Sequence, residues 1–136
     1  MTIQNHPAIK ANILSTELAS TGDKTAWLAL YAEDAVLKDP VGISMLEPSG
    51  AGHRGKAAIE SFWDAVIGPS NIKLEVKQRI ISGSHDCAVF QQVSNDMGNG
   101  KITVVDMIAT YKVNDQGLIV EMHAYWNFDE LMAQML

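Results

Sequence analysis

A single acidic residue at the end of a short apolar stretch is the first feature that could do chemistry. Asp39 follows residues 34–38, which read as a strand, and precedes Pro40 directly. A proline disfavours the helical region for the residue before it, so we expect Asp39 to be held in an extended conformation. A carboxylate presented by a rigid strand end could act as a proton acceptor. Aspartate and proline are also common turn residues, and the alternative is that Asp39 only starts a turn.

The elements around Asp39 must position it. A first helix is expected after Pro7 and ends at Thr21-Gly22, a second is capped by Asp23, a third begins near Lys56, and residues 128–136 can form a short closing helix. A period of two then predicts strands near residues 72–82, 86–95, 101–113 and 118–127. Gly- and Asn-containing turns of the kind found in antiparallel hairpins separate them. Helices followed by strands indicate an α+β fold, with a curved, mostly antiparallel sheet wrapped over about three helices.

Four segments of the chain resemble ketosteroid isomerases and their relatives in the NTF2-like (SnoaL-like) superfamily. They are the Asp39-Pro40 pair, the helix start at Gly22-Asp23, residues 55–63, and residues 117–126, which end in Met-His-Ala-Tyr-Trp. The resemblance covers nearly the whole chain. It implies an NTF2-like cone enclosing an apolar pocket for a steroid-like or polyketide-like molecule, and a reaction without cofactor or metal.

The resemblance also implies chemical roles. In ketosteroid isomerases a carboxylate base moves a proton next to a ketone, while a tyrosine and a protonated aspartate donate hydrogen bonds to the oxygen that becomes charged. Asp39 matches the base by its motif. Counted from Gly22-Asp23 and from Gly117, the two donor positions fall at Ser15 and Ala109. The chain therefore keeps the family's base and lacks its oxyanion tyrosine and acid.

Strand alternation, the apolar stripe of the third helix and the resemblance together predict the pocket lining. Odd positions of 101–113 and even positions of 118–127 are mostly apolar and are expected to face inward. By resemblance, Tyr31 matches a supporting tyrosine, Trp63 replaces another aromatic residue, and Trp126 matches a pocket tryptophan. With Asp39 as the catalytic residue, the predicted ligand contacts are Ser15, Tyr31, Phe62, Trp63, Phe90, Met107, Ala109, Met122 and Trp126.

Other ionisable residues are expected to lie outside the pocket. Asp106 lies three residues from Ala109, so alternation points it to the opposite face unless a bulge intervenes. At about 100° per residue, Asp64 falls on the solvent side of the third helix. Arg54 is expected at the surface and His123 at the surface or an interface. The histidines show no ligand spacing, so no metal site is predicted.

The composition predicts one domain over residues 1–136 and a small hydrophobic molecule as partner. The formal charge of −6, without a basic patch, argues against nucleic acid. The N-terminus lacks the pattern of a signal peptide, and no apolar run approaches the roughly 20 residues that span a bilayer. The lone Cys87 fits a small core residue in a reducing compartment, and a cytoplasmic location is expected.

The outward faces of the last two strands are too apolar for a fully solvated sheet, which predicts a homodimer through this surface. The apolar residues expected there are Ile102, Val104, Ile108, Ile119 and Tyr125.

Three readings of the function remain open from the sequence. The first is a ketosteroid-isomerase-like enzyme in which Asp39 transfers a proton next to a carbonyl. The second is a protein that binds a hydrophobic ligand without efficient catalysis, which the absence of both family donors favours. The third is an epoxide hydrolase or cyclase on the same frame, with Asp64 or Arg54 as the group that protonates the leaving oxygen.

Overall fold

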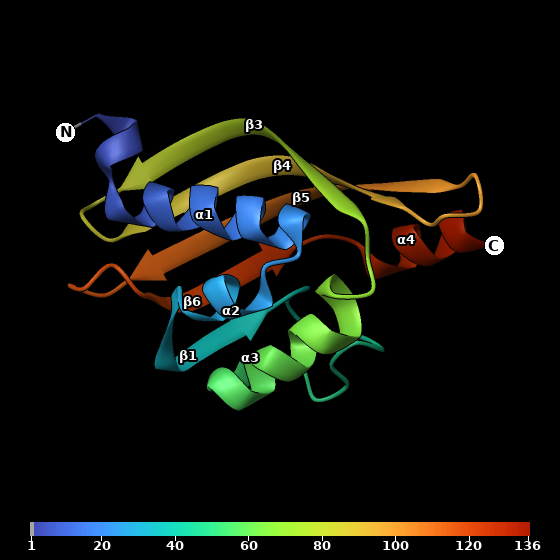
Figure 1. Cartoon of the computed structure of the whole chain (residues 1–136), viewed down its shortest axis with the longest axis horizontal. Helices are drawn as coiled ribbons and strands as arrows, with labels where there is room; N and C mark the ends of the chain where they lie inside the picture. Colours follow the sequence, from blue (N-terminus) through green and yellow to red (C-terminus); the bar gives the residue numbers. More distant parts are fainter. Residues whose placement is uncertain (1) are drawn as a thin grey trace.

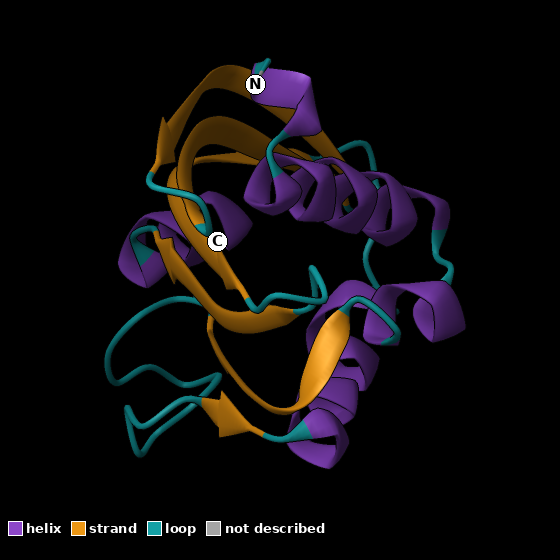
Figure 2. Ribbon diagram, turned by 90° about the vertical axis from the view of Figure 1, so that its left-hand side faces the viewer, coloured by secondary structure: helices purple, strands orange, loops and turns teal. Residues whose placement is uncertain are grey.

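A curved six-stranded sheet forms one layer of the molecule, and helices cover its concave face (Figures 1 and 2). The computed structural model describes residues 2–136. The strands are β1 (Tyr31–Lys38), β2 (His53–Arg54), β3 (Ile72–Ser82), β4 (Asp86–Asp96), β5 (Ile102–Val113) and β6 (Ile119–Tyr125). The helices are η1 (Ile3–Asn5), α1 (Pro7–Thr21), α2 (Lys24–Leu28), α3 (Lys56–Phe62), the π-helical turn η2 (Trp63–Ile67) and α4 (Phe128–Met135).

The sheet has the strand order β2-β1-β6-β5-β4-β3. All neighbouring pairs are antiparallel except β1 and β6, which run parallel. This confirms the predicted α+β class and the curved, mostly antiparallel sheet. The long strands β3 to β6 lie within one or two residues of their predicted bounds. The first strand begins at Tyr31, three residues before the predicted start at residue 34.

The helix boundaries follow local side-chain chemistry. Gly22 ends α1 with a φ of 76°, in the left-handed region that glycine adopts without steric cost. The Asp23 carboxylate then accepts a hydrogen bond of 3.1 Å from the Ala26 amide and caps α2, as predicted. The third helix begins at Lys56, as expected, and becomes π-helical from Trp63 onward.

The inner faces of the strands form the core, with one departure from simple alternation. Odd positions of β5 are buried, as predicted. Ile119, which alternation placed on the outward face of the last strand, is fully buried. The cause is a register shift between β5 and β6, where Lys112 pairs with Glu121 but Val113 pairs with Ile119. The prediction that Ile119 lies on the outer face is therefore wrong.

The strand β6 stops short of the full length of β5, and α4 covers part of the edge that remains. The last β6 residue, Tyr125, pairs with Ile108. Beyond this point the side chain of Gln134 makes both bonds that a neighbouring strand would make to Val104. Its Oε1 accepts from the Val104 amide at 2.7 Å, and its Nε2 donates to the Val104 carbonyl at 2.8 Å. The C-terminal helix thus lies beside β5 (Figure 1).

The outer face of the sheet carries large apolar side chains that are exposed to solvent. They are Ile80, Phe90, Ile102, Val104, Ile108 and Tyr125.

None of the helices in residues 2–136 is long and apolar enough to cross a membrane. Cys87 is buried, and burial raises the pKa of its thiol to about 11, as expected for a small core residue.

Candidate active site

A cavity lies between the concave face of the sheet and the helices, and Asp39 stands in its wall. The volume within which the centre of a water molecule can be placed is about 160 Å³. By the same measure one water needs roughly 10–15 Å³, so the cavity is far larger than a packing defect. Its lining is Ser15, Thr16, Ala19, Trp27, Tyr31, Leu37, Asp39, Phe62, Val66, Ile67, Ser70, Ile72, Leu74, Gln91, Val93, Asn95, Thr103, Val105, Met107, Tyr111, Met122, Trp126 and Leu131.

Asp39 follows the last residue of β1 and is anchored from both sides. The next strand, β6, pairs with β1 up to Lys38, and its Ala124 carbonyl accepts a 2.8 Å bond from the amide of Val41. Among the described residues that line the cavity, Asp39 is the one that can carry a charge at neutral pH. Its carboxylate is therefore presented by a rigid sheet to a largely apolar space.

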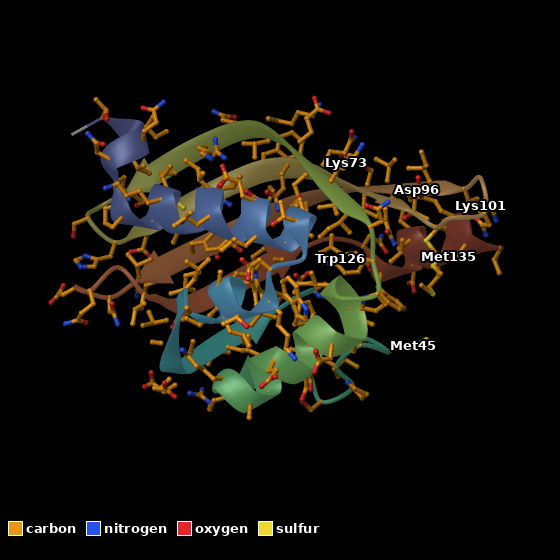
Figure 3. All side chains as sticks on the ribbon, in the orientation of Figure 1. Met45, Lys73, Asp96, Lys101, Trp126 and Met135 are labelled. Carbon is orange, nitrogen blue, oxygen red and sulfur yellow. The ribbon has the colours of Figure 1, made fainter. Side chains whose placement is uncertain are left out.

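The electrostatics of Asp39 are set by burial and by one hydrogen bond. Burial raises the pKa of the carboxyl group from 3.8 to about 6, because the charged form loses hydration. The indole Nε1 of Trp126 donates a 2.6 Å hydrogen bond to Oδ1 and lowers the pKa in part. Trp126 directly follows β6 and lies toward the end of the molecule that carries α4 (Figure 3). With a pKa near 6, Asp39 could accept a proton at neutral pH and release it again.

Two buried tyrosines, Tyr31 at the start of β1 and Tyr111 on β5, line the cavity together with Ser15. The Ser15 hydroxyl oxygen accepts a 3.3 Å bond from the indole of Trp27, which leaves its own proton free to be donated. The Tyr31 hydroxyl is buried and has no hydrogen-bond partner in the part of the chain that the structure describes.

Both phenols are kept protonated. Burial raises the pKa of Tyr31 well above its ordinary value and also raises that of Tyr111. The charge of Asp39 raises both pKa values further, and the hydroxyl of Ser15 lowers both in part. A protonated phenol in an apolar site is a hydrogen-bond donor. The wall therefore combines a proton acceptor with donors that could face a ligand oxygen.

The structure brings most of the predicted ligand contacts to the cavity. Ser15, Tyr31, Phe62, Met107, Met122 and Trp126 line it together with Asp39.

Three predicted contacts lie elsewhere. Phe90 is 41% exposed on the outer face of the sheet, because its neighbours Val89 and Gln91 alternate inward. Trp63 is buried against Trp27, with ring centroids 5.0 Å apart, and is not part of the lining. Ala109 is fully buried and is not part of the lining. The prediction that these three residues line the pocket is corrected accordingly.

The alternative ionisable residues lie away from the cavity. The side chain of Asp64 is 57% exposed and pairs with Lys24 at 2.8 Å. Arg54 is exposed, and His123 is partly buried. Asp106 is exposed and accepts a 3.1 Å bond from Gln92, as alternation predicted. Within residues 2–136, no group of three or more histidine, cysteine or carboxylate side chains could hold a metal ion.

Sequence reasoning missed Trp27 and Gln91 as lining residues, and it treated Tyr111 only as part of the inner face. A signal for Gln91 was present, because it occupies an inward position in the alternation of residues 86–95. Trp27 carried no such signal, because it lies on the short second helix, for which no inward face was predicted.

Known proteins share this fold and much of this sequence. A SnoaL-like domain profile matches residues 15–122. The steroid Delta-isomerase of Nocardioides simplex is 35% identical over 105 residues, which cover 77% of each chain.

Among solved structures, the Δ5-3-ketosteroid isomerase from Mycobacterium sp. is 35% identical, with a TM-score of 0.86, and the match covers 92% of this chain and 96% of that one. RV0760c from Mycobacterium tuberculosis is 34% identical with a TM-score of 0.88, covering 96% and 97% of the two chains. RV0760c has also been solved in complex with estradiol-17beta-hemisuccinate. The shared fold and the match over most of its length show that the chain belongs to the SnoaL-like domain family, with ketosteroid isomerases among its relatives.

Proposed function

We propose that the protein is a ketosteroid-isomerase-like enzyme that binds a steroid-like or polyketide-like ketone and moves a proton next to its carbonyl. The observation that carries the proposal is the placement of Asp39, a lone carboxylate with a pKa of about 6 in the wall of an apolar cavity. An acid in this range can serve as a base and then as an acid at neutral pH.

The proposed reaction needs no other reactant. Asp39 takes a proton from the carbon next to the ketone, and the electrons of that C–H bond move toward the carbonyl oxygen. The neutral carboxylic acid then returns the same proton to a carbon further along the conjugated system. One C–H bond breaks, another forms, and the double bond moves into conjugation with the ketone.

Negative charge develops on the ketone oxygen during this transfer, and donors are needed to stabilise it. The family positions for these donors hold Ser15 and Ala109. We propose that Tyr31 and Tyr111 supply the hydrogen bonds instead. The Tyr31 hydroxyl has no partner among residues 2–136, and burial keeps both phenols protonated. The hydroxyl of Ser15 acts on Tyr111 and lowers its pKa in part, so a proton directed from Ser15 toward that phenol oxygen would leave the Tyr111 proton for the ligand.

The relatives support a steroid-like ligand. One is a steroid Delta-isomerase and another has been solved with a steroid hemisuccinate. The apolar lining suits a fused-ring hydrocarbon body, because burial of apolar surface drives such binding.

A second candidate is a protein that binds such a molecule without efficient catalysis, which the residues at positions 15 and 109 favour. An epoxide hydrolase or cyclase is less well supported, because Asp64 and Arg54 lie at the surface and cannot protonate an oxygen in the cavity as they stand.

We also propose that the protein forms a homodimer through the outer face of the sheet. Its exposed apolar side chains resemble the buried centre of a protein–protein interface.

An isomerase assay separates the first two candidates. A 3-keto-Δ5 steroid is added, and the conjugated product is followed by ultraviolet absorbance, with binding measured in parallel by quenching of tryptophan emission. Turnover that disappears in Asp39→Asn supports the isomerase. Binding without turnover supports the carrier, and turnover that survives in Asp39→Asn contradicts the role of Asp39.

A further inference from the structure

Gln91 is a buried amide in the cavity wall that the proposed reaction does not use. Its side chain is 1% exposed, and its Nε2 donates a 3.3 Å hydrogen bond to the thioether sulfur of Met107. The Oε1 atom is buried and has no hydrogen-bond partner within the described residues 2–136. An unpaired buried amide oxygen costs free energy, and nearly all such groups in folded proteins have partners.

The surroundings of Gln91 give no structural reason for an amide. On β4 the inward neighbours of Gln91 are Val89 and Val93, and the opposite residue on β5 is Met107. An aliphatic side chain would fill this apolar wall without an unsatisfied polar atom. Since Gln91 lines the cavity, a molecule bound there is the partner that could satisfy its amide oxygen.

The hydrogen bond to Met107 fixes the orientation of the amide. A thioether sulfur accepts hydrogen bonds and cannot donate them, so the NH₂ group must face Met107. The free atom of Gln91 is therefore the carbonyl oxygen, an acceptor. Its natural partner is a donor such as a hydroxyl group.

Gln91 and Asp39 both line the cavity, and the strands β6 and β5 lie between the strands that carry them. The register leads from Lys38 on β1 to His123 on β6 and on to Thr110 on β5. Gln91 on β4 pairs with Met107, which lies further along β5. Three strand spacings of ~4.8 Å separate the two strands, or about 14 Å along the sheet and less across its concave face. A ligand that touches both residues must bridge this gap and must carry polar groups at two separate positions.

We propose that Gln91 binds a hydroxyl group at the end of the ligand remote from its reacting carbonyl. The proposal rests on the proposed function for the position of the carbonyl at Asp39. It narrows the ligand class to rigid, polycyclic hydroxyketones, in which the hydroxyl satisfies Oε1 and the carbonyl faces Asp39 and the tyrosines.

The experiment combines two ligands with three proteins. The ligands are a 3-keto-Δ4 steroid with a 17β-hydroxyl group and the same steroid with hydrogen at that position. Both carry the double bond in its conjugated position, so binding is measured by tryptophan quenching without turnover. The proteins are the wild type, Gln91→Leu and Gln91→Met, the last being a nearly volume-conserving second variant in case the first packs poorly.

Wild type is expected to bind the hydroxysteroid about tenfold more tightly than the deoxysteroid, and this ratio should fall to about one in both variants. Both variants should be at least as thermally stable as the wild type, because they remove an unpaired acceptor. If both variants keep the same preference for the hydroxysteroid as the wild type, Gln91 does not bind the hydroxyl group. That result overturns the Gln91 contact and does not affect the proposed function. Failure of wild type to bind either steroid overturns the contact and the proposed ligand class together.

Discussion

The indole of Trp126 donates a 2.6 Å hydrogen bond to Oδ1 of Asp39, joining the residue after β6 to the residue after β1. This bond fixes one oxygen of the carboxylate and leaves Oδ2 to take up a proton. It also opposes the desolvation that raises the pKa of Asp39. The pair therefore sets both the direction and the acidity of the proposed base.

Removing the indole donor should raise the pKa of Asp39 further. In Trp126→Phe we expect the pKa to increase from about 6 by roughly one pH unit, because a hydrogen bond to a charged group contributes about 1.5–3 kcal/mol and only part of it is lost once the side chain relaxes. Titration of the carboxyl carbon by NMR measures this directly. A pKa that stays the same or falls would show that the bond does not stabilise the carboxylate.

The raised pKa of Asp39 also predicts a pH-dependent stability. The folded-state pKa of about 6 lies above the unfolded value near 3.8, so ionisation opposes folding. The stabilisation of the folded state by the neutral carboxyl group is fully present below pH 3.8. It decreases as the pH rises above that value and is lost once the pH has risen through about 6. The total loss is on the order of 2–3 kcal/mol.

Asp39→Asn should remove this dependence. Relative to the wild type, the variant should gain stability between about pH 4 and pH 6 and keep that gain at neutral pH. Urea unfolding at several pH values provides the measurement. If the difference in unfolding free energy does not change with pH, Asp39 is not held in a desolvated site; if the variant fails to fold, Asp39 is a structural turn residue.

Removing the hydroxyl group of either buried tyrosine should lower kcat, whereas removing that of an exposed tyrosine should not. Tyr31→Phe and Tyr111→Phe are each expected to lower kcat by about 10²–10³-fold if they donate to the developing oxyanion. Tyr31→Phe should cost little stability, because the hydroxyl that it removes has no partner among residues 2–136. Tyr125→Phe, at a position that is 50% exposed, is the control and should leave kcat unchanged. Full activity in both buried variants would leave the oxyanion without the proposed donors.

The outer face of the sheet predicts how the chain associates. Ile108 is 48% exposed on this face, and Ile108→Asp should place an unpaired charge in the proposed interface and yield a monomer of about 15 kDa. Leu14→Asp makes the same chemical change at a residue that is 44% exposed on α1, away from the sheet, and should leave a dimer. Sedimentation at micromolar concentration distinguishes the two. A monomeric wild type would contradict the prediction.

The fold could be predicted because periodicity and turn residues act locally. Gly22 and Asp23 specify the break between the first two helices, and alternation specifies the inner face of β5. Ile119 could not be placed in this way, because a single register shift against β5 reverses the alternation near it. Such a shift depends on pairing between strands and leaves no mark in the period of either one.

The candidate site was predictable in part. The Asp39-Pro40 motif located the carboxylate, and alternation placed Met107 and Met122 in the wall. Trp63 was misplaced because apolar periodicity does not distinguish a residue that faces a cavity from one that packs against a second aromatic ring. The orphaned atoms of Tyr31 and Gln91 could not be predicted, since a missing partner is a property of three-dimensional packing.

The two bonds between Gln134 and Val104 have a consequence for the behaviour of the protein in concentrated solution. Where β6 ends, β5 would otherwise present an amide and a carbonyl to any passing extended chain, and exposed strand edges of this kind promote aggregation. A side-chain amide copies the donor and acceptor of a peptide group, so Gln134 occupies both positions without adding a strand. The C-terminal helix therefore keeps this unpaired edge of β5 from forming backbone hydrogen bonds with other molecules.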